Sequence, residues 1–294
     1  MDKIHIPVLL EESITALNID PNGFYIDCTL GDGGHSYKIL SRLSSQGLLL
    51  SIDRDQNAID FVKEYYEIPS NWIIEKDNFS NIKNVLERLN ISRNPSGILM
   101  DLGLSSRQLE SSKNRGFSYQ EDNESLDMRM DTDLNVNALD LLKALNEKEL
   151  SKLFKLYGEE RYAKPIARAI KENTSDISTV GDLTSLIYKV VPVASNNKNP
   201  SRRVFQALRI AVNDELNSLK EGLDSAFEVL STDGRLLVIT FHSLEDRIVK
   251  RFFNEKEDNK EGKIISKTPV IPNEKELQEN HRSSSAKLRI LGKI

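Results

Sequence analysis

The sequence predicts an α/β fold in which a doubly wound, mostly parallel sheet is interrupted by an inserted all-helical domain. Short apolar runs alternate with helix-like segments over the first hundred or so residues, a pattern typical of parallel βαβ units. The alternation is lost from about residue 105 to residue 215, where helical patterns follow one another, and it returns at 234–241. We therefore expect a discontinuous sheet domain, 1–108 with 214–294, and a helical insertion domain, 109–213.

The first half of the sheet domain contains four expected strands and three expected helices. The strands are apolar runs of strand length, at 24–30, 48–53, 71–77 and 97–104. The helices between them carry apolar residues three or four positions apart, at 35–46, 56–67 and 81–90. Parallel sheets of this kind bind ligands beyond the carboxyl ends of their strands.

The rest of the chain supplies the insertion and the second half of the sheet domain. Five helices are expected in a row, at 139–145, 148–157, 161–172, 180–191 and 203–219. A strand at 234–241 and a helix at 244–255 then resume the alternation. Two antiparallel edge strands are expected at 263–267 and 286–291, and the polar stretch between them reads as loop.

Composition limits the function classes that need to be considered. The chain has 294 residues and a formal net charge of −5, with 38% hydrophobic residues and one cysteine. No apolar run approaches the roughly 20 residues that cross a bilayer, and the amino terminus lacks the layout of a signal peptide. The single cysteine, Cys28, excludes an internal disulfide framework and a cysteine-cluster metal site. We expect a cytoplasmic protein with no membrane partner and no metal.

A glycine-rich turn, DCTLGDGGHS, follows the first expected strand and precedes the first helix of the alternation. A dinucleotide site requires G-x-G-x-x-G, but in this frame Gly31 and Gly33 are followed by Ser36 in the third position. No Gly-Lys-Ser/Thr follows, so the turn is not a phosphate P-loop. A turn of this kind brings backbone N–H groups close to a carboxylate or a sugar.

Acidic residues recur where the expected strands end. Asp53 lies roughly 20 residues after the glycines, where a carboxylate typically binds the ribose hydroxyls of an adenine nucleotide. Asp27, Asp77 and Asp101 lie at or near three other strand ends, and Phe79 could pack against an adenine ring. Methyl transfer from S-adenosylmethionine is the first hypothesis, and hydride transfer with NAD is the second.

An ordered set of motifs resembles the MraW family of ribosomal RNA methyltransferases. It includes HIPVLLEE, DCTLGDGGHS, DLGLSSRQL, GEERYAKPIARAI, NPSRRVFQALRIAVNDEL, GRLLVITFHSLEDRIVKRFF and SAKLRIL. The resemblance implies a class I, Rossmann-like methyltransferase with an inserted helical domain and S-adenosylmethionine as donor. It also implies N4 of a decoding-region cytidine in 16S ribosomal RNA as acceptor, within the small ribosomal subunit.

The resemblance also assigns cofactor contacts residue by residue. They would be Gly33, Gly34, His35, Asp53, Phe79, Asp101 and Gln108. Near the carboxyl end the chain departs from the family pattern, because His281 and Ser284 stand where proline and arginine are expected. That departure puts a contact between this tail and RNA in doubt.

The residues also bear on the reaction. Asp101 occupies the place where amino-directed methyltransferases carry an acidic or amide residue, so it could orient the target amine, hold the donor, or both. Methylation at carbon 5 of cytosine needs a cysteine nucleophile, and Cys28 lies inside an expected strand. Ribose methylation, another RNA base, and an RNA-binding protein with a vestigial cofactor fold all stay open.

Two further groups of residues have candidate roles. Arg202, Arg203 and Arg209 lie in the expected helix at 203–219 or just before it, and could contact RNA phosphates. His242 follows a strand end, but Ser243 and Asp246 fit a capping box, which is a structural role. The sequence leaves the oligomeric state open, a homodimer included.

Overall fold

A computed structural model describes residues 7–105, 115–192 and 199–294. The chain separates into two compact units, Met1–Leu104 with Leu216–Ile294, and Ser105–Glu215. The junctions are therefore 104/105 and 215/216, whereas the sequence pattern placed them at 108/109 and 213/214. Among the described residues, no helix is long and apolar enough to cross a membrane.

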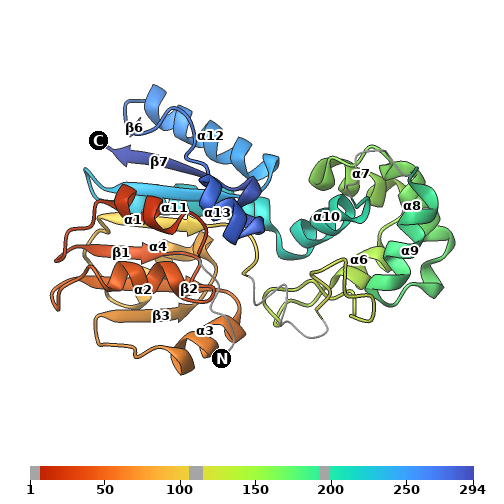
Figure 1. Ribbon diagram of the computed structural model, residues 1–294, viewed down its shortest axis with the longest axis horizontal. Coiled ribbons are helices and arrows are strands. Elements are labelled where there is room, and N and C mark those ends of the chain that lie inside the picture. Colours follow the sequence, from red (N-terminus) through yellow and green to blue (C-terminus); the bar gives the residue numbers. More distant parts are fainter. Residues whose placement is uncertain (1–6, 106–114, 193–198) are drawn as a thin grey trace. The chain divides into compact units, whose positions relative to one another are not determined.

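The first unit, here called the sheet unit, contains one sheet of seven strands in the order β3-β2-β1-β4-β5-β7-β6 (Figure 1). The strands are β1 (Phe24–Asp27), β2 (Leu48–Asp53), β3 (Trp72–Lys76), β4 (Gly97–Asp101), β5 (Arg235–Thr240), β6 (Gly262–Ile264) and β7 (Lys287–Lys293). The first five are parallel, and β7 runs antiparallel to β5 and β6. The predicted α/β fold, a doubly wound sheet with an inserted helical segment, is confirmed.

Within the described residues, three helices cover each face of the sheet. On one face lie α1 (Leu10–Leu17), α2 (Gly34–Leu40) and α3 (Gln56–Tyr65), and on the other lie α4 (Ile82–Arg88), α11 (Glu215–Val229) and α12 (Ser243–Asp258). In β5, Leu237 and Ile239 belong to the first core, and Leu236 and Val238 belong to the second. Because both faces are covered, this strand reads as one continuous apolar run in the sequence.

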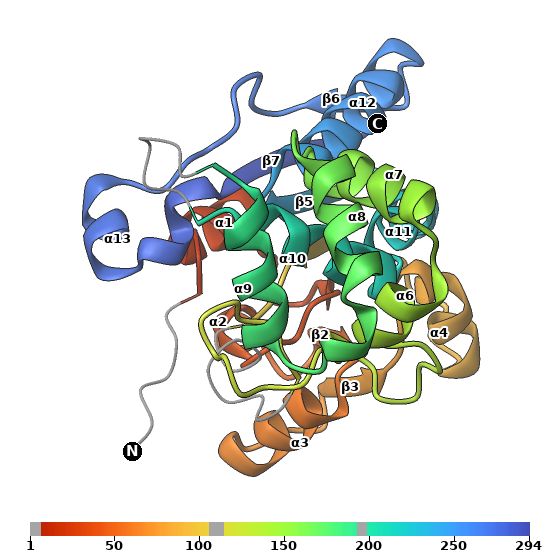
Figure 2. The ribbon, with the colours of Figure 1, turned by 90° about the vertical axis from the view of Figure 1, so that its right-hand side faces the viewer.

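The second unit, here called the inserted unit, has an irregular segment at 115–137 followed by helices in its described part (Figure 2). Its helices are α6 (Ala138–Ala144), α7 (Glu147–Gly158), α8 (Ala163–Glu172), α9 (Val180–Val190) and α10 (Ser201–Asn213). Capping boxes start three of them, with Asn137, Asn146 and Thr179 as the capping residues. Each box satisfies N–H groups that a helix start would otherwise leave without a partner.

One expected helix, 203–219, is in fact two. Asp214 has a left-handed φ of 48° and separates α10 from α11. Next to it, the buried side chain of Asn213 accepts a hydrogen bond from Met130 N (2.8 Å) and donates one to Met128 O (2.7 Å). These hydrogen bonds hold the chain in place at the break. The periodicity of apolar residues alone does not indicate a break here.

The carboxyl-terminal segment also differs from the expectation. The stretch read as loop contains a short helix, α13 (Glu274–Glu279), and a 3-10 turn, η3 (His281–Ser285). The strand at the end, β7, was expected at an edge but lies inside the sheet, between β5 and β6. Helix α13 lies beside α1, which is the first helix of the sheet unit (Figures 1 and 2).

Candidate functional site

The candidate site is built at the carboxyl edge of the parallel strands. Asp27, Asp53 and Asp101 are the last residues of β1, β2 and β4, and Asp77 follows β3 directly. Since these strands are parallel neighbours, their ends lie along one edge of the sheet, where doubly wound folds bind ligands. The structure thus brings together the acidic residues that the sequence analysis singled out.

The glycine turn between β1 and α2 depends on three glycines for different reasons. Gly31 and Gly33 have positive φ angles of 51° and 81°, which other residues adopt only with strain. The Gly31 N–H donates a 2.8 Å hydrogen bond to Asp53 Oδ2, so the turn is tied to the end of β2. Gly34 begins α2, and a side chain there would come within 2.2 Å of the Pro7 ring.

Behind the turn, Asp27 is fully buried and organises a set of hydrogen bonds. Its carboxyl group accepts hydrogen bonds from the Ser36 hydroxyl (2.6 Å) and from the Thr29 N–H (3.1 Å). Ser36 also contacts Ser51 Oγ at 2.8 Å, and the Trp72 indole donates to Ser51 Oγ at 2.9 Å. Burial raises the pKa of Asp27 to about 7, because removal from water penalises the charged carboxylate.

Asp101 and His35 face each other across the site. Asp101 Oδ2 lies 3.5 Å from His35 Nδ1, and His35 is almost completely buried. The Asp101 N–H donates a 2.7 Å hydrogen bond to Thr29 Oγ1, which fixes the end of β4 relative to β1. The other carboxyl oxygen, Asp101 Oδ1, is buried and has no hydrogen-bond partner among the residues that the structure describes. It is an acceptor that a ligand could satisfy.

The protonation of Asp101 is unusual as well. Burial raises its pKa well above the ordinary range, and the charges of Asp27, Glu245 and Glu276 act in the same direction. Asp53 also has a raised pKa, again mainly because of burial. Perturbed carboxyl groups that cluster at a strand edge are typical of functional sites, although ion-pair networks also produce them.

The fourth strand-end carboxylate, Asp77, and the last two residues of the expected cofactor set, Phe79 and Gln108, lie in different environments. Asp77 is already engaged, because its carboxylate accepts hydrogen bonds from Arg88 and Asn81. Phe79 is half-buried and packs so closely on α11 that a side chain at Gly222 would come within 2.5 Å of its ring. Gln108 lies outside the described residues.

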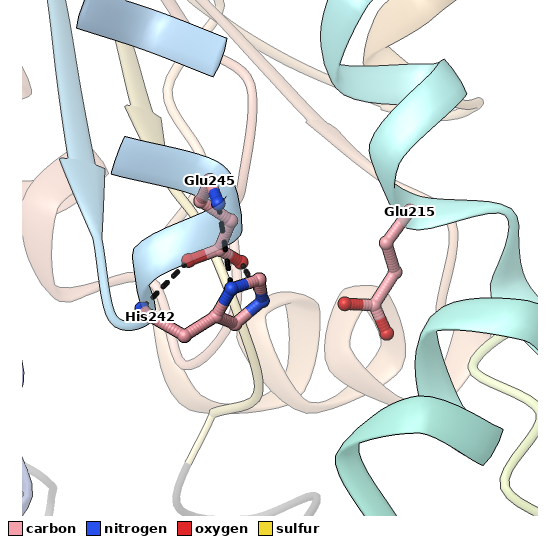
Figure 3. A group of neighbouring side chains, drawn as sticks. All are labelled: Glu215, His242 and Glu245. Atoms are coloured by element: carbon pink, nitrogen blue, oxygen red, sulfur yellow. Dashed lines mark hydrogen bonds and ion pairs between the residues drawn. The ribbon is translucent and has the colours of Figure 1, made fainter. Parts of the chain in front are cut away.

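His242 caps helix α12, as Figure 3 shows. Its Nδ1 accepts the Glu245 N–H at 3.4 Å, and Glu245 Oε2 accepts the N–H groups of Phe241 (2.8 Å) and His242 (3.2 Å). The capping box is therefore formed by His242 and Glu245, one residue before the expected pair of Ser243 and Asp246. Asp246 instead binds Lys287 (3.0 Å) and Arg289 (2.7 Å) of β7.

The three arginines of α10 do not share one environment. Arg202 and Arg203 are exposed, and Arg203 makes only a long 3.3 Å hydrogen bond to Glu159 O among the contacts described. Arg209 is mostly buried and binds both carboxylate oxygens of Glu215, at 2.8 and 2.9 Å. This bidentate pair lies within the inserted unit and is a structural contact.

Cys28, the one cysteine, is buried in the core directly after β1. Burial raises the pKa of its thiol well above the usual value, with the charge of Asp27 acting in the same direction. Because the thiolate is the nucleophilic form, this residue is unsuited to covalent attack on a substrate.

Some residues of the site were missed by sequence reasoning. Ser51 and Trp72 read as ordinary strand residues, and nothing in their spacing marks them as partners of Ser36. Ser36 itself carried a signal, since it occupies the position of the third glycine in a dinucleotide frame. A polar residue in that position indicates a buried hydrogen bond in place of close helix–strand packing.

Comparison with known proteins extends over the whole chain. A model of the MraW methylase family matches residues 2–294. The chain is similar to the ribosomal RNA small subunit methyltransferase H of Fusobacterium nucleatum, with 45% identity over 316 residues that cover 100% of this chain and 99% of the relative. It is equally similar to the protein of that name from Clostridium botulinum, with 45% identity over 312 residues and full coverage of both chains.

Proposed function

We infer the function from one premise: the chain belongs to the MraW methylase family. We propose that it is an S-adenosylmethionine-dependent methyltransferase that acts on small-subunit ribosomal RNA. The observation that carries this proposal is the full-length similarity to ribosomal RNA small subunit methyltransferases H, which covers both the sheet unit and the inserted unit. The cell compartment that fits a ribosomal substrate is the cytoplasm.

The carboxyl edge of the sheet fits an adenosyl methyl donor. Asp53 would bind the ribose hydroxyls, and Phe79 would pack against the adenine ring. The turn at Gly33, Gly34 and His35 would hold the methionine end, supported by the positive φ of Gly33 and by the helix start at Gly34. The buried oxygen Asp101 Oδ1, which lacks a partner among the described residues, would accept a hydrogen bond from such a ligand. Gln108 completes the proposed set by family position.

We propose N4 of a decoding-region cytidine in 16S ribosomal RNA as the acceptor. When bound, the donor supplies an electrophilic methyl group for an in-line displacement. The exocyclic amine of cytosine is a weak nucleophile, because its lone pair is delocalised into the ring. Asp101 could accept a hydrogen bond from that amine and localise the lone pair. The buried Cys28 thiol argues against the rival reaction at carbon 5, which needs a cysteine nucleophile.

The protein's own contribution to this reaction is mainly positioning. Holding two reactants in line can lower a barrier by roughly 7–11 kcal/mol. The Asp27 hydrogen bonds support this role, because through Thr29 they connect the ends of β1 and β4 beneath the site. On the inserted unit, the exposed Arg202 and Arg203 are proposed to contact RNA phosphates.

The test is methylation of small ribosomal subunits prepared from a strain that lacks this protein. Purified protein and S-adenosylmethionine are added, and the modified nucleoside is located by mass spectrometry of nuclease fragments. We expect one methyl group on N4 of a decoding-region cytidine. A methyl group on carbon 5 or on a ribose would contradict the proposed acceptor, and no transfer at all would contradict the proposed activity.

A further inference from the structure

The amino-terminal motif HIPVLLEE has no role in the function proposed above, yet part of it packs on the glycine turn. Pro7 touches Gly34 so closely that a single added carbon at Gly34 would lie 2.2 Å from its ring. Gly34 is the first residue of α2 and follows Gly33 of the turn. The position of Pro7 therefore limits how far the start of α2 can move in that direction.

Two residues after Pro7, the backbone adopts a conformation that needs support. Leu9 is completely buried and has a left-handed φ of 54°, which costs an ordinary residue free energy. It caps helix α1 without a side-chain hydrogen bond from its own residue. A conformation of this kind persists only when its surroundings impose it.

The support comes from the other end of the chain. The Leu9 N–H donates a 2.8 Å hydrogen bond to Glu276 Oε1, on helix α13, across 267 positions of sequence. Glu276 is itself held in place, because the Asn273 side chain accepts its N–H at 3.0 Å as the cap of α13. A carboxylate near the start of α1 is also favoured by the helix dipole.

The same carboxylate also acts electrostatically on the candidate site. The charge of Glu276 is one of the groups that raise the pKa of Asp101, after burial and the charges of Asp27 and Glu245. An ion pair also joins α1 directly to α2, since Lys38 of α2 lies 2.7 Å from Glu11 of α1. Glu11 is mostly exposed, so this ion pair adds little, and the contacts of the partly buried Pro7 and the buried Leu9 dominate.

We propose that Glu276 is a positioning residue for the methyl donor: through Leu9 and Pro7 it holds the glycine turn at Gly33–His35 in its binding conformation. This inference rests on the proposed function. It assigns a role to α13, which comes just before the segment where the chain departs from its family pattern, at His281 and Ser284. Glu276 acts through other residues and does not itself take part in methyl transfer.

The experiment compares three variants of the full-length protein. Glu276→Ala removes the acceptor for Leu9 N–H, and Glu276→Gln keeps an amide oxygen in the same place. Glu279→Ala, on the same helix but exposed, is the matched control. Affinity for S-adenosylmethionine is measured by calorimetry, and steady-state kinetics on small subunits separates the two substrates.

We expect Glu276→Ala to raise the Kd and KM for S-adenosylmethionine about fivefold, the effect of losing one ordinary hydrogen bond. The KM for small subunits should stay unchanged. Glu276→Gln should bind the donor nearly as well as the wild type, and so should Glu279→Ala. An amide-exchange measurement should show faster exchange at Leu9 in Glu276→Ala only.

Unchanged donor affinity in a folded Glu276→Ala protein would overturn the inference, even if the melting temperature fell, because Glu276 would then only stabilise α1. If that variant does not fold, Pro7→Ala decides the matter. It keeps the Leu9 hydrogen bond but removes the ring from Gly34, and it should also weaken donor binding. Failure of the wild-type protein to bind the donor would instead contradict the proposed function.

Discussion

The Ser36 hydroxyl donates a 2.6 Å hydrogen bond to the buried carboxyl group of Asp27, from the position where a dinucleotide-binding turn has its third glycine. The departure from the glycine pattern is thus part of a polar core beneath the site. That core contains a carboxyl group with a pKa raised to about 7, which makes the stability of the protein depend on pH near neutrality.

Asp27 should make the protein more stable in mild acid than in mild base. Its pKa is raised in the folded state, so its contribution is fully present below about pH 4 and is lost as the pH rises through about 7. A rise from 3.8 to about 7 corresponds to at most about 4 kcal/mol. Urea unfolding of Asp27→Asn and the wild type, at about pH 5 and about pH 8, should show the wild type losing more stability.

The exposed Asp60→Asn in α3 is the control for this measurement, because it removes a carboxyl group from a solvated site. Its pH dependence should match that of the wild type. If Asp27→Asn and the wild type lose the same free energy of unfolding between the two pH values, Asp27 is not the cause of the pH dependence.

Asp101→Asn should reduce kcat/KM about 100-fold, which is typical when a positioned electrostatic group is removed. Calorimetry with S-adenosylmethionine separates the two roles. A higher Kd for S-adenosylmethionine would indicate that Asp101 holds the donor. A lower kcat with an unchanged Kd would indicate that it orients the amine. Asp77→Asn is the control, because Arg88 and Asn81 already occupy its carboxylate. Full turnover and unchanged Kd in Asp101→Asn would exclude both roles.

Cys28→Ala should keep kcat close to the wild-type value, because a buried thiol with a raised pKa takes no part in the proposed reaction. The lost core atom should lower stability by only about 1 kcal/mol. Activity is measured on small subunits, and urea unfolding gives the stability. A folded Cys28→Ala protein without activity would favour a covalent mechanism and a carbon 5 product.

Replacing both Arg202 and Arg203 by Gln should weaken binding of small subunits and should leave donor affinity unchanged. If each side chain contacts one phosphate, the slope of log affinity against log salt should fall by about 2. Arg209→Gln provides a contrast, since it breaks the bidentate pair with Glu215 and should lower the free energy of unfolding by about 2 kcal/mol. If the double variant keeps the wild-type slope of log affinity against log salt, Arg202 and Arg203 do not contact RNA phosphates.

The strands and the helices that pack on them were predictable, because strands buried on both faces appear in the sequence as continuous apolar runs. In β5 and its neighbours, apolar residues fill both faces. An acidic residue at or directly after the end of each of β1 to β4 marks the ligand edge. Asp53 and Asp101 could therefore be placed at one edge without coordinates. The turn glycines could be recognised from the same pattern, because Gly31 and Gly33 need backbone angles that other residues avoid.

Other features depend on contacts between distant residues and left little trace in the sequence. The break at Asp214 lies next to the buried amide of Asn213, two of whose hydrogen-bond partners, Met128 and Met130, are more than 80 positions away. The cap at His242 was assigned one residue late, because serine is the commoner capping residue and stood next to it. Helix α13 is short and polar, so its pairing with Leu9 through Glu276 could not be read from periodicity.

The position of β7 has a consequence for how the protein is made. This strand, Lys287–Lys293, lies between β5 and β6, and β5 in turn pairs with β4, from residues 97–101. During synthesis, the edge of β5 therefore stays unpaired until residues 287–293 have emerged, whereas the inserted unit is a contiguous segment that emerges earlier. A nascent chain that stops before residue 287 would present β5 as an open apolar edge, which is a template for aggregation. Premature termination should thus yield insoluble protein, although nearly all of the binding residues would already be present.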